Sequence, residues 1–384
     1  MNWRVPLSDV NLDAAEIDAV LSVLRSGWLT MGSVTQAFEQ EFAAFTGSKH
    51  ALAVANGTAA LHLACLALGL GPGDEVILPS LTFVASANAI RYTGATPVFV
   101  DIESTDWLCL SPQAISAALT PRTKAIMVVH YAGYPCDMPA ILEIARQHHL
   151  AVIEDAAHAV GAALEGKALG TWGDIGCFSF FGNKNLTTGE GGMLLTQDDQ
   201  LAEKLQRLRS HGMTTLTWDR HEGHASTYDV VALGYNYRID EMRSAMGRVQ
   251  LQKLPAGNVR RGELVGLYRQ LLAEYAPEVQ VPFTQQRSLS SYHIMPVLLP
   301  EGTDKQHFMA KMKEHGIQVS WHYPPVHAFK IYAETWNQRR TPLPLTDLVS
   351  AREVTLPLYP TMSEEQVGWV VEAVRNCLDK YLIV

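Results

Sequence analysis

Short apolar runs alternate with amphipathic segments from residue 51 to residue 155, and this alternation restricts the possible folds strongly. The runs that have the length and composition of buried strands lie at 51–54, 75–78, 97–101, 125–130 and 151–155. Segments with helical periodicity lie between them, at 59–70, 83–92, 111–119 and 138–148. Strands and helices at this spacing predict an α/β fold in which helices cover a mostly parallel sheet.

Elements outside this region indicate how the chain divides. Helices are expected at 12–25 and 198–209. The stretch that follows at 210–232 has no periodicity, and a loop of this length is typical of a lid or a subunit contact. A long helix should begin near Gly234 and end at Pro255. The elements expected beyond it are helices at 259–276, 304–315 and 363–381 and strands at 292–299 and 317–321. We therefore predict a large domain with N-terminal helices over 1–255 and a smaller α+β C-terminal domain over 256–384.

Composition excludes several classes of protein. The 384 residues are 47% hydrophobic, enough for one large core and a second, smaller one. A formal net charge of −9 argues against a nucleic-acid or anionic-membrane surface. The five scattered cysteines form no CxxC pair, so neither a disulfide framework nor a zinc site is expected. The first residues lack the apolar core of a signal peptide, which makes a cytoplasmic location the expectation.

A lysine lies in a Gly- and Asn-rich turn between two further apolar runs. The first run begins at Ile175 and predicts a buried strand with Ser179 and Lys184 at its end, and the second run follows at 193–196. Such a lysine is either a solvated turn residue or an amine held at the strand ends, where open α/β sheets bind ligands.

Polar residues also follow two of the other predicted strands. Gly57 and Thr58 come between a strand and a helix, where free backbone N–H groups and the helix dipole favour an anion, although Thr58 is equally suited to be a simple N-cap. Asp155 ends another buried strand and is either a ligand-binding carboxylate or the cap of the next turn. His158 follows three residues later and is either a ligand-binding residue or a core histidine.

Together these residues match the needs of pyridoxal 5'-phosphate. Thr58 and Ser179 suit its phosphate, and Asp155 suits the pyridine nitrogen, which must stay protonated. His158 suits the phenolic side of the ring, and Lys184 suits the aldehyde, which a lysine captures as a Schiff base. Phe83 is a candidate to stack on the ring, with an ordinary core role as the alternative.

Six motifs resemble the DegT/StrS family of nucleotide-sugar aminotransferases, in the same order and over nearly the whole chain. They begin at Asn56 (NGTAALHL), Gly71 (GPGDEVILPSLTF), Glu154 (EDAAH), Gly173 (GDIGCFSFF), Lys184 (KNLTTGEGG) and Gly234 (GYNYR). The resemblance implies a pyridoxal-phosphate-dependent homodimer of fold type I with its active site at the subunit boundary.

The resemblance also implies a role for particular residues. It carries Lys184 as the Schiff-base lysine, Asp155 at the ring nitrogen with His158 beside it, and Thr58 and Ser179 at the phosphate. It further implies that Asn236 reaches the phosphate of the partner subunit's cofactor. The long loop before Gly234 and the residues His322, Tyr323 and His327 are expected to border a sugar nucleotide.

The expected reaction is amination of C4 in a nucleoside-diphosphate 4-keto-6-deoxyhexose, with L-glutamate as the amino donor. Some relatives carry histidine where the Schiff-base lysine belongs, so Lys184 favours transamination here. The motifs most resemble perosamine-type synthases. The alternatives are a 3-keto-sugar aminotransferase, a cyclitol (keto-inositol) aminotransferase and a non-catalytic pyridoxal-phosphate-binding regulatory protein. A nicotinamide dehydrogenase is disfavoured, because Gly69-Leu-Gly-Pro-Gly follows a helix and is not GxGxxG after a strand.

Overall fold

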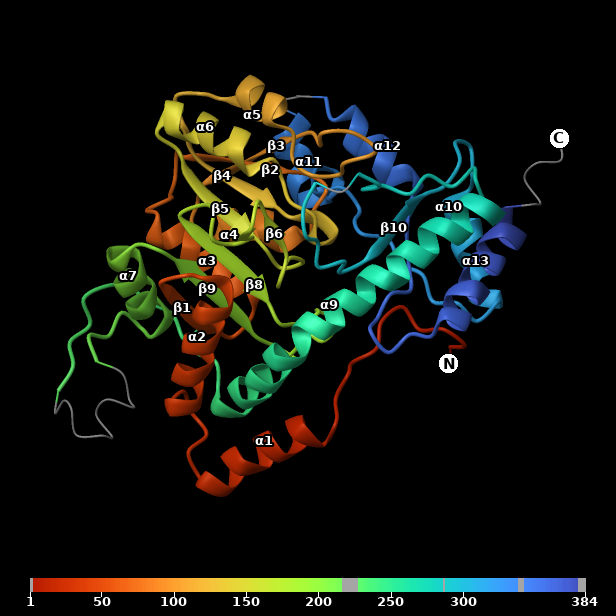
Figure 1. The fold of residues 1–384 in the computed structure, drawn as a ribbon. Helices are drawn as coiled ribbons and strands as arrows, with labels where there is room; N and C mark the ends of the chain where they lie inside the picture. The colour runs from red at the N-terminus through yellow and green to blue at the C-terminus, as the bar shows by residue number, and fades with distance from the viewer. Residues whose placement is uncertain (1–2, 216–226, 286, 338–341, 379–384) are drawn as a thin grey trace.

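A seven-stranded sheet forms the centre of the protein, as seen in a computed structural model that describes residues 3–215, 227–285, 287–337 and 342–378 (Figure 1). The strand order is β1-β9-β8-β5-β4-β2-β3. The strands are β1 (His50–Val54), β2 (Glu75–Pro79), β3 (Thr96–Val100), β4 (Thr123–Val129), β5 (Ala151–Asp155), β8 (Ile175–Ser179) and β9 (Gly192–Thr196). β9 alone runs in the opposite direction to the other strands of this sheet, so the predicted mostly parallel α/β fold is confirmed.

Helices cover both faces of the sheet, because successive strand residues point to opposite sides. Ile77 and Ile126 pack with α5 and α6, whereas the adjacent Leu78 and Met127 pack with α3, α4 and α7. The covering helices are α2 (Ser33–Thr46), α3 (Gly57–Ala67), α4 (Val84–Tyr92), α5 (Pro112–Ala118), α6 (Met138–His148) and α7 (Asp199–Arg209). The sheet core is therefore closed on both sides, and ligands can approach only at its edges.

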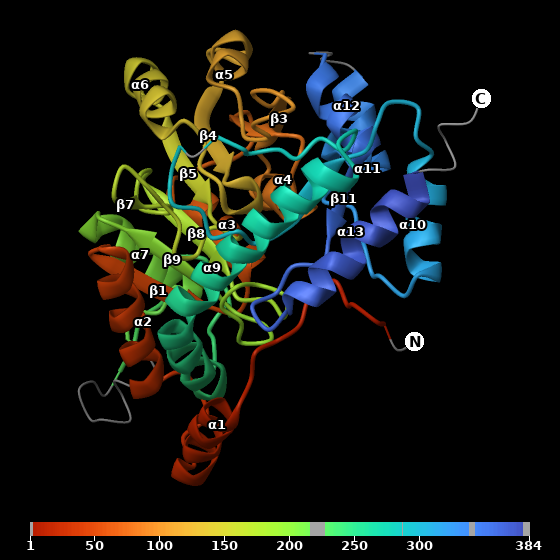
Figure 2. The ribbon, with the colours of Figure 1, turned by 45° about the vertical axis from the view of Figure 1, so that its right-hand side comes forward.

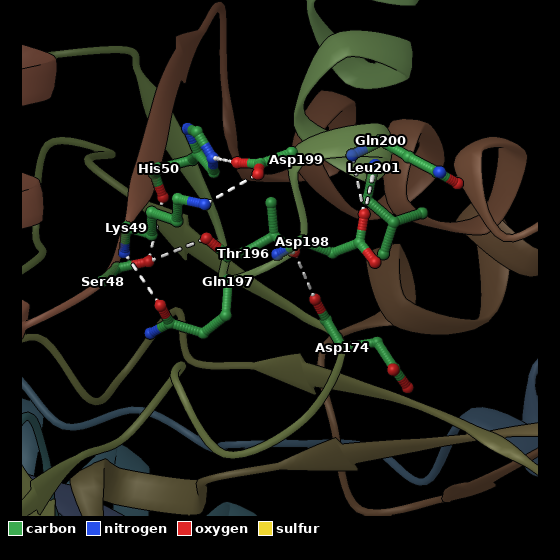
Figure 3. Close-up of polar contacts among 10 residues, drawn as sticks. All are labelled: Ser48, Lys49, His50, Asp174, Thr196, Gln197, Asp198, Asp199, Gln200 and Leu201. Carbon is green, nitrogen blue, oxygen red and sulfur yellow. Dashed lines mark hydrogen bonds and ion pairs between the residues drawn. The ribbon is translucent and has the colours of Figure 1, made fainter.

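A polar network at the edge formed by the amino ends of the parallel strands fixes how β9 joins β1 (Figure 3). The Ser48 hydroxyl donates to the Thr196 carbonyl at 3.2 Å, and the Thr196 hydroxyl donates to the Asp174 carbonyl at 2.8 Å. Lys49 and His50 both contact the Asp199 carboxylate, at 2.7 and 2.6 Å, where α7 begins. These contacts hold β1 and β9 in register, and the opposite, carboxyl edge remains for the functional residues.

A single helix, α9 (Glu241–Tyr275), runs from the sheet to the C-terminal part of the chain (Figures 1 and 2). The prediction that Pro255 ends a helix is wrong, because α9 continues through it. A proline inside a helix costs about 3 kcal/mol. Burial on both sides offsets that cost, since Leu254 packs in the sheet region and Leu264 in the C-terminal core. The helix α1 (Ala14–Ser26) packs across α9 through hydrogen bonds from Gln250 and Lys253 to Glu16.

The C-terminal part is α+β, as expected, with some elements that the sequence did not indicate. It contains β10 (Met295–Leu298), β11 (Glu353–Leu356), α10 (Lys305–Glu314), α11 (Lys330–Asn337), α12 (Pro344–Arg352) and α13 (Glu364–Leu378). The strand predicted at 317–321 is wrong, because only single bridges from Ile317 to Val5 and from Ser320 to Thr355 form there. Val5 also lies in the C-terminal core, and the boundary at residue 255 falls inside α9, so the proposed division into 1–255 and 256–384 stays a prediction.

The remaining short elements connect these parts. They are η1 (Tyr131–Gly133), β6 (Ala163–Leu164), β7 (Lys167–Ala168) and η2 (Val326–Ala328). Of the long stretch predicted at 210–232, residues 216–226 lie outside the described residues, and its two flanks pair through Met213 and Val230. In the part of the chain that the structure describes, no helix has both the length and the apolar character that a bilayer span requires.

Candidate active site

A cavity of about 430 Å³ opens at the carboxyl edge of the sheet. It lies where β1, β5 and β8 end, which is the edge at which open α/β sheets bind ligands. Most of the residues singled out in the sequence line it, namely Gly57, Thr58, Phe83, Asp155, His158, Ser179, Lys184, His322 and Tyr323. The fold therefore brings together side chains that lie far apart along the chain.

Lys184 reaches the cavity from the turn that follows β8. Its backbone N–H donates to the Phe181 carbonyl at 2.9 Å, which fixes the turn, and its side chain lies deep in the cavity. Burial lowers the pKa of the Lys184 amine to about 8, against the attraction of Asp155, which acts to raise it. The amine lies 3.3 Å from Nε2 of His293. It is thus a nucleophile that is partly neutral near physiological pH.

We predict that the capture of pyridoxal phosphate by the cofactor-free protein follows the titration of Lys184. Only the neutral amine attacks an aldehyde, so the rate should rise about tenfold per pH unit below pH 8 and level off above it. Stopped-flow absorption after mixing the two measures this rate. A rate that does not change between about pH 6 and pH 9 would contradict the assignment of this pKa.

Asp155 supplies a buried carboxylate at the end of β5. It is 6% exposed, accepts a hydrogen bond from the Ser86 hydroxyl at 2.7 Å, and accepts another from the Ala157 N–H at 3.2 Å. Burial raises the pKa of this carboxyl, while its donors and the charge of Lys184 act to lower that pKa. A carboxylate held in this way is suited to a cationic ring nitrogen.

The start of α3 forms a site for an anion beside Ser179. Asn56 caps the helix by accepting from the Ala59 N–H at 2.8 Å. Gly57 and Thr58, as the first residues of the helix, have no carbonyl acceptor within it. A Cβ atom at Gly57 would lie 2.8 Å from Cβ of Ser179, so only glycine lets the two segments approach this closely. Two backbone N–H groups and two hydroxyls thus converge as a phosphate requires.

Aromatic side chains form one wall of the cavity. The Phe83 ring is 56% exposed, precedes α4 and lies 5.8 Å from the Tyr323 ring, which makes it available to stack on a planar ligand. His158 accepts from the Ala132 N–H at Nδ1, at 3.3 Å. Burial and the charge of Lys184 lower the pKa of His158 well below its usual value, so its single hydrogen lies on Nε2 and is donated to the Tyr323 oxygen at 2.9 Å.

Several residues of the site gave no sequence signal. Ser86 orients Asp155, His293 contacts Lys184, and the Glu353 carboxylate accepts from the His322 N–H at 2.9 Å. Ser86 lies three residues beyond Phe83 on α4, and this helical spacing would have been the only available indication. The contact of His293 with Lys184 forms only when the C-terminal part packs against the sheet, and the contact of Glu353 with His322 joins two distant segments within the C-terminal part.

Two of the predicted residues lie outside this cavity. Asn236 is exposed and pairs with Ser210, the residue that caps the C-terminal end of α7. His327 contacts the Ser80 hydroxyl at 2.8 Å and the Asp347 carboxylate at 3.2 Å. Neither residue lines the cavity of its own chain.

Comparisons with known proteins agree with this arrangement. The DegT/DnrJ/EryC1/StrS aminotransferase family profile matches residues 10–375. The chain is 42% identical over 380 residues to the spore coat polysaccharide biosynthesis protein SpsC of Bacillus subtilis (strain 168), covering 98% of this chain and 97% of that protein. It is 30% identical to Helicobacter pylori PseC, an aminotransferase involved in the biosynthesis of pseudoaminic acid, with a TM-score of 0.91 and coverage of 98% and 99%. It is 28% identical to the PLP form of the putative sugar aminotransferase Spr1654 from Streptococcus pneumoniae, with a TM-score of 0.90 and coverage of 98% of this chain and 99% of that chain. The predicted fold type I aminotransferase fold is thereby confirmed.

Proposed function

The chain belongs to the DegT/DnrJ/EryC1/StrS aminotransferase family, and from this premise we propose that it moves the amino group of L-glutamate to C4 of a nucleoside-diphosphate 4-keto-6-deoxyhexose. The observation that carries the proposal is the meeting of Lys184, Asp155 and the start of α3 in one cavity. A nucleophilic amine, a buried carboxylate and an anion site are the three groups that an aminotransferase of this fold requires.

The cavity fits pyridoxal phosphate residue by residue. Gly57, Thr58 and Ser179 would hold its phosphate, and Asp155 would pair with its ring nitrogen. His158 and Phe83 would lie against the ring, and Lys184 would bind its aldehyde. When bound, this cofactor accepts the amino group of the donor and gives it to the acceptor. The close approach of Gly57 to Ser179 supports this fit, since a side chain at position 57 would collide with Ser179, whose hydroxyl we assign to the phosphate.

Lys184 has a second task once the donor has displaced it. With a pKa of about 8, about one tenth of its amine is neutral at pH 7, so it can take the proton from Cα of the donor. In the second half of the reaction it returns a proton to the new amino-bearing carbon. Neutral His158 adds no charge to the cavity, which leaves Asp155 as the anion that faces the ring nitrogen.

The sugar acceptor is supported by the relatives and by the cavity wall. The name of SpsC places that protein in polysaccharide biosynthesis, and Spr1654 is described as a putative sugar aminotransferase. His322 and Tyr323 line the cavity and supply polar groups for a hydroxylated ring, and His327 follows in the same segment. We assign these three residues to the sugar nucleotide.

We also propose a cytoplasmic homodimer with shared active sites. Leu233 is 87% exposed and lies three residues before Asn236, and α1 exposes Ile17 and Leu24. Such apolar surface favours a subunit contact, and it would bring Asn236 of one chain to the phosphate site of the other. The five cysteines are buried and form no disulfide bond, as a reducing compartment favours.

The test is to convert the purified enzyme with L-glutamate and then add keto sugars. We expect the absorption band of the lysine-bound cofactor to disappear with glutamate and to return with a nucleoside-diphosphate 4-keto-6-deoxyhexose. Product analysis by NMR locates the new amino group at C4. A return of the band only with a 3-keto sugar or a keto-inositol would replace the proposed acceptor, and a band unaffected by glutamate would overturn the proposed donor.

A further inference from the structure

A chain of hydrogen bonds inside the protein fixes the orientation of the Asn185 side chain, the neighbour of Lys184. The Asn258 amide donates to the Val160 carbonyl at 2.9 Å, so the Asn258 amide oxygen faces Asn185. The Asn185 amide nitrogen donates both to this oxygen, at 2.8 Å, and to the Ser291 carbonyl, at 2.7 Å. Carbonyl groups accept only, so the orientation of both amides is determined, and the Asn185 oxygen must act as an acceptor.

That acceptor determines which nitrogen of His293 carries the hydrogen. Nδ1 of His293 lies 2.9 Å from the Asn185 oxygen and must donate to it. The ring is 4% exposed, and burial together with the nearby cations lowers the pKa of His293 well below its usual value, so the ring carries one hydrogen. Nε2 is therefore an acceptor, and it faces the Lys184 amine at 3.3 Å.

We propose that His293 is a positioning residue for Lys184: its Nε2, fixed as an acceptor by Asn185 and Asn258, holds the amine at the end of the cavity whenever that amine is not bonded to the cofactor. This inference rests on the proposed function, in which Lys184 is displaced and must return. The held amine stays beside the reacting atoms and does not rotate into solvent. Accurate placement of a reacting group is worth much in rate, since a displacement of about 1 Å can cost 10²-fold.

The charged and titratable groups around this pair come from several elements. Asp155 attracts the Lys184 amine, and His158 lies with its ring centre 4.4 Å from that of His293. His322 lies on the side of the C-terminal part, and the Arg261 guanidinium of α9 donates to the His293 carbonyl at 3.3 Å. Asp155 favours the ammonium form of Lys184. The other groups are cationic or neutral, so among them the acceptor Nε2 of His293 is the further contact that favours this form.

The experiment compares His293→Asn with His293→Gln in the full-length, cofactor-free protein. An asparagine amide reaches the position of Nδ1 and keeps a partner for Asn185, but leaves Lys184 without an acceptor. A glutamine amide reaches the position of Nε2 and can still accept from Lys184. Competitive labelling with acetic anhydride at several pH values, read by peptide mass spectrometry, measures the pKa of Lys184. Lys305, whose pKa is also lowered to about 8, serves as the internal control in the same digest.

We expect His293→Asn to lower the pKa of Lys184 by roughly one unit, because a hydrogen bond that favours the ammonium is lost. In His293→Gln the pKa of Lys184 should stay close to that of the natural protein. The pKa of Lys305 should not move. After each variant is reconstituted with pyridoxal phosphate, its single-turnover rate with L-glutamate should fall by roughly 10- to 100-fold in His293→Asn and much less in His293→Gln. Circular dichroism confirms that both variants are folded.

The outcomes separate this inference from the proposed function. If the natural enzyme does not react with glutamate but the Lys184 pKa shifts as described, the proposed function fails and the role of His293 stands. If the enzyme reacts and both variants leave the Lys184 pKa unchanged, His293 does not hold the amine and the inference is overturned. Equal shifts in the two variants would also overturn it, since they would show a general disturbance of the site.

Discussion

Changing Lys184 to Ala is expected to abolish turnover with L-glutamate and a keto sugar. Proton transfer by a positioned side chain alone contributes roughly 10²–10⁴-fold, and the variant also loses covalent capture of the cofactor, so the loss should reach at least the upper end of this range. The structure supports this size of effect, because the amine lies in the same cavity as Asp155 and the α3 anion site. Steady-state rates and the absorption spectrum of the reconstituted variant measure it.

Lys305 provides a matched control for this experiment. Burial lowers its pKa to about 8, the same value as for Lys184, but its amine lies over the Trp321 ring and outside the cavity. Lys305→Arg should therefore keep nearly full activity. After borohydride reduction of the reconstituted natural protein, the cofactor should be found on the peptide of Lys184 alone. A cofactor adduct on Lys305, or normal turnover by Lys184→Ala, would refute the assignment.

Much of the fold could be predicted because its causes are local. The strands of the central sheet are short apolar runs between turn residues, and their helices carry a clear 3.6-residue period. Pro255 misled the prediction because proline disfavours a helix locally, whereas the burial of Leu254 and Leu264 on either side favours its continuation. The strand expected at 317–321 does not form, since this segment makes only single bridges, from Ile317 to Val5 and from Ser320 to Thr355 of β11.

The site was predictable to the extent that its residues follow strand ends. β5 ends at Asp155, β8 ends at Ser179, and α3 begins just after β1. These three strands end at the same edge of the sheet, so the topology alone brings the residues together. His293 and Glu353 belong to the C-terminal part, and their approach depends on how α9 places that part against the sheet. Asn236 and His327 were expected from the resemblance alone, and neither lines the cavity of its own chain.

The second large effect is expected for Asp155→Asn, which removes the charge and keeps the shape. Loss of one member of a buried ion pair costs roughly 3–5 kcal/mol, so turnover should fall by about 10²–10⁴-fold. The amide can still accept a hydrogen bond, so the protein should remain folded. Cofactor-binding titrations and single-turnover rates with glutamate separate weaker binding from slower proton transfer.

Ser86→Ala is the graded comparison, because it keeps the carboxylate and removes one of its donors. The Ser86 hydroxyl acts to lower the pKa of Asp155, which burial raises, so the variant should raise that pKa further. The charged form is then lost at a higher pH, and the acidic limb of the pH–rate profile should move upward by up to about one unit. At pH 7 the rate should fall by less than about tenfold. If Ser86→Ala left the acidic limb of the pH–rate profile unchanged while Asp155→Asn was inactive, the limb would reflect the titration of another group and not the protonation of Asp155.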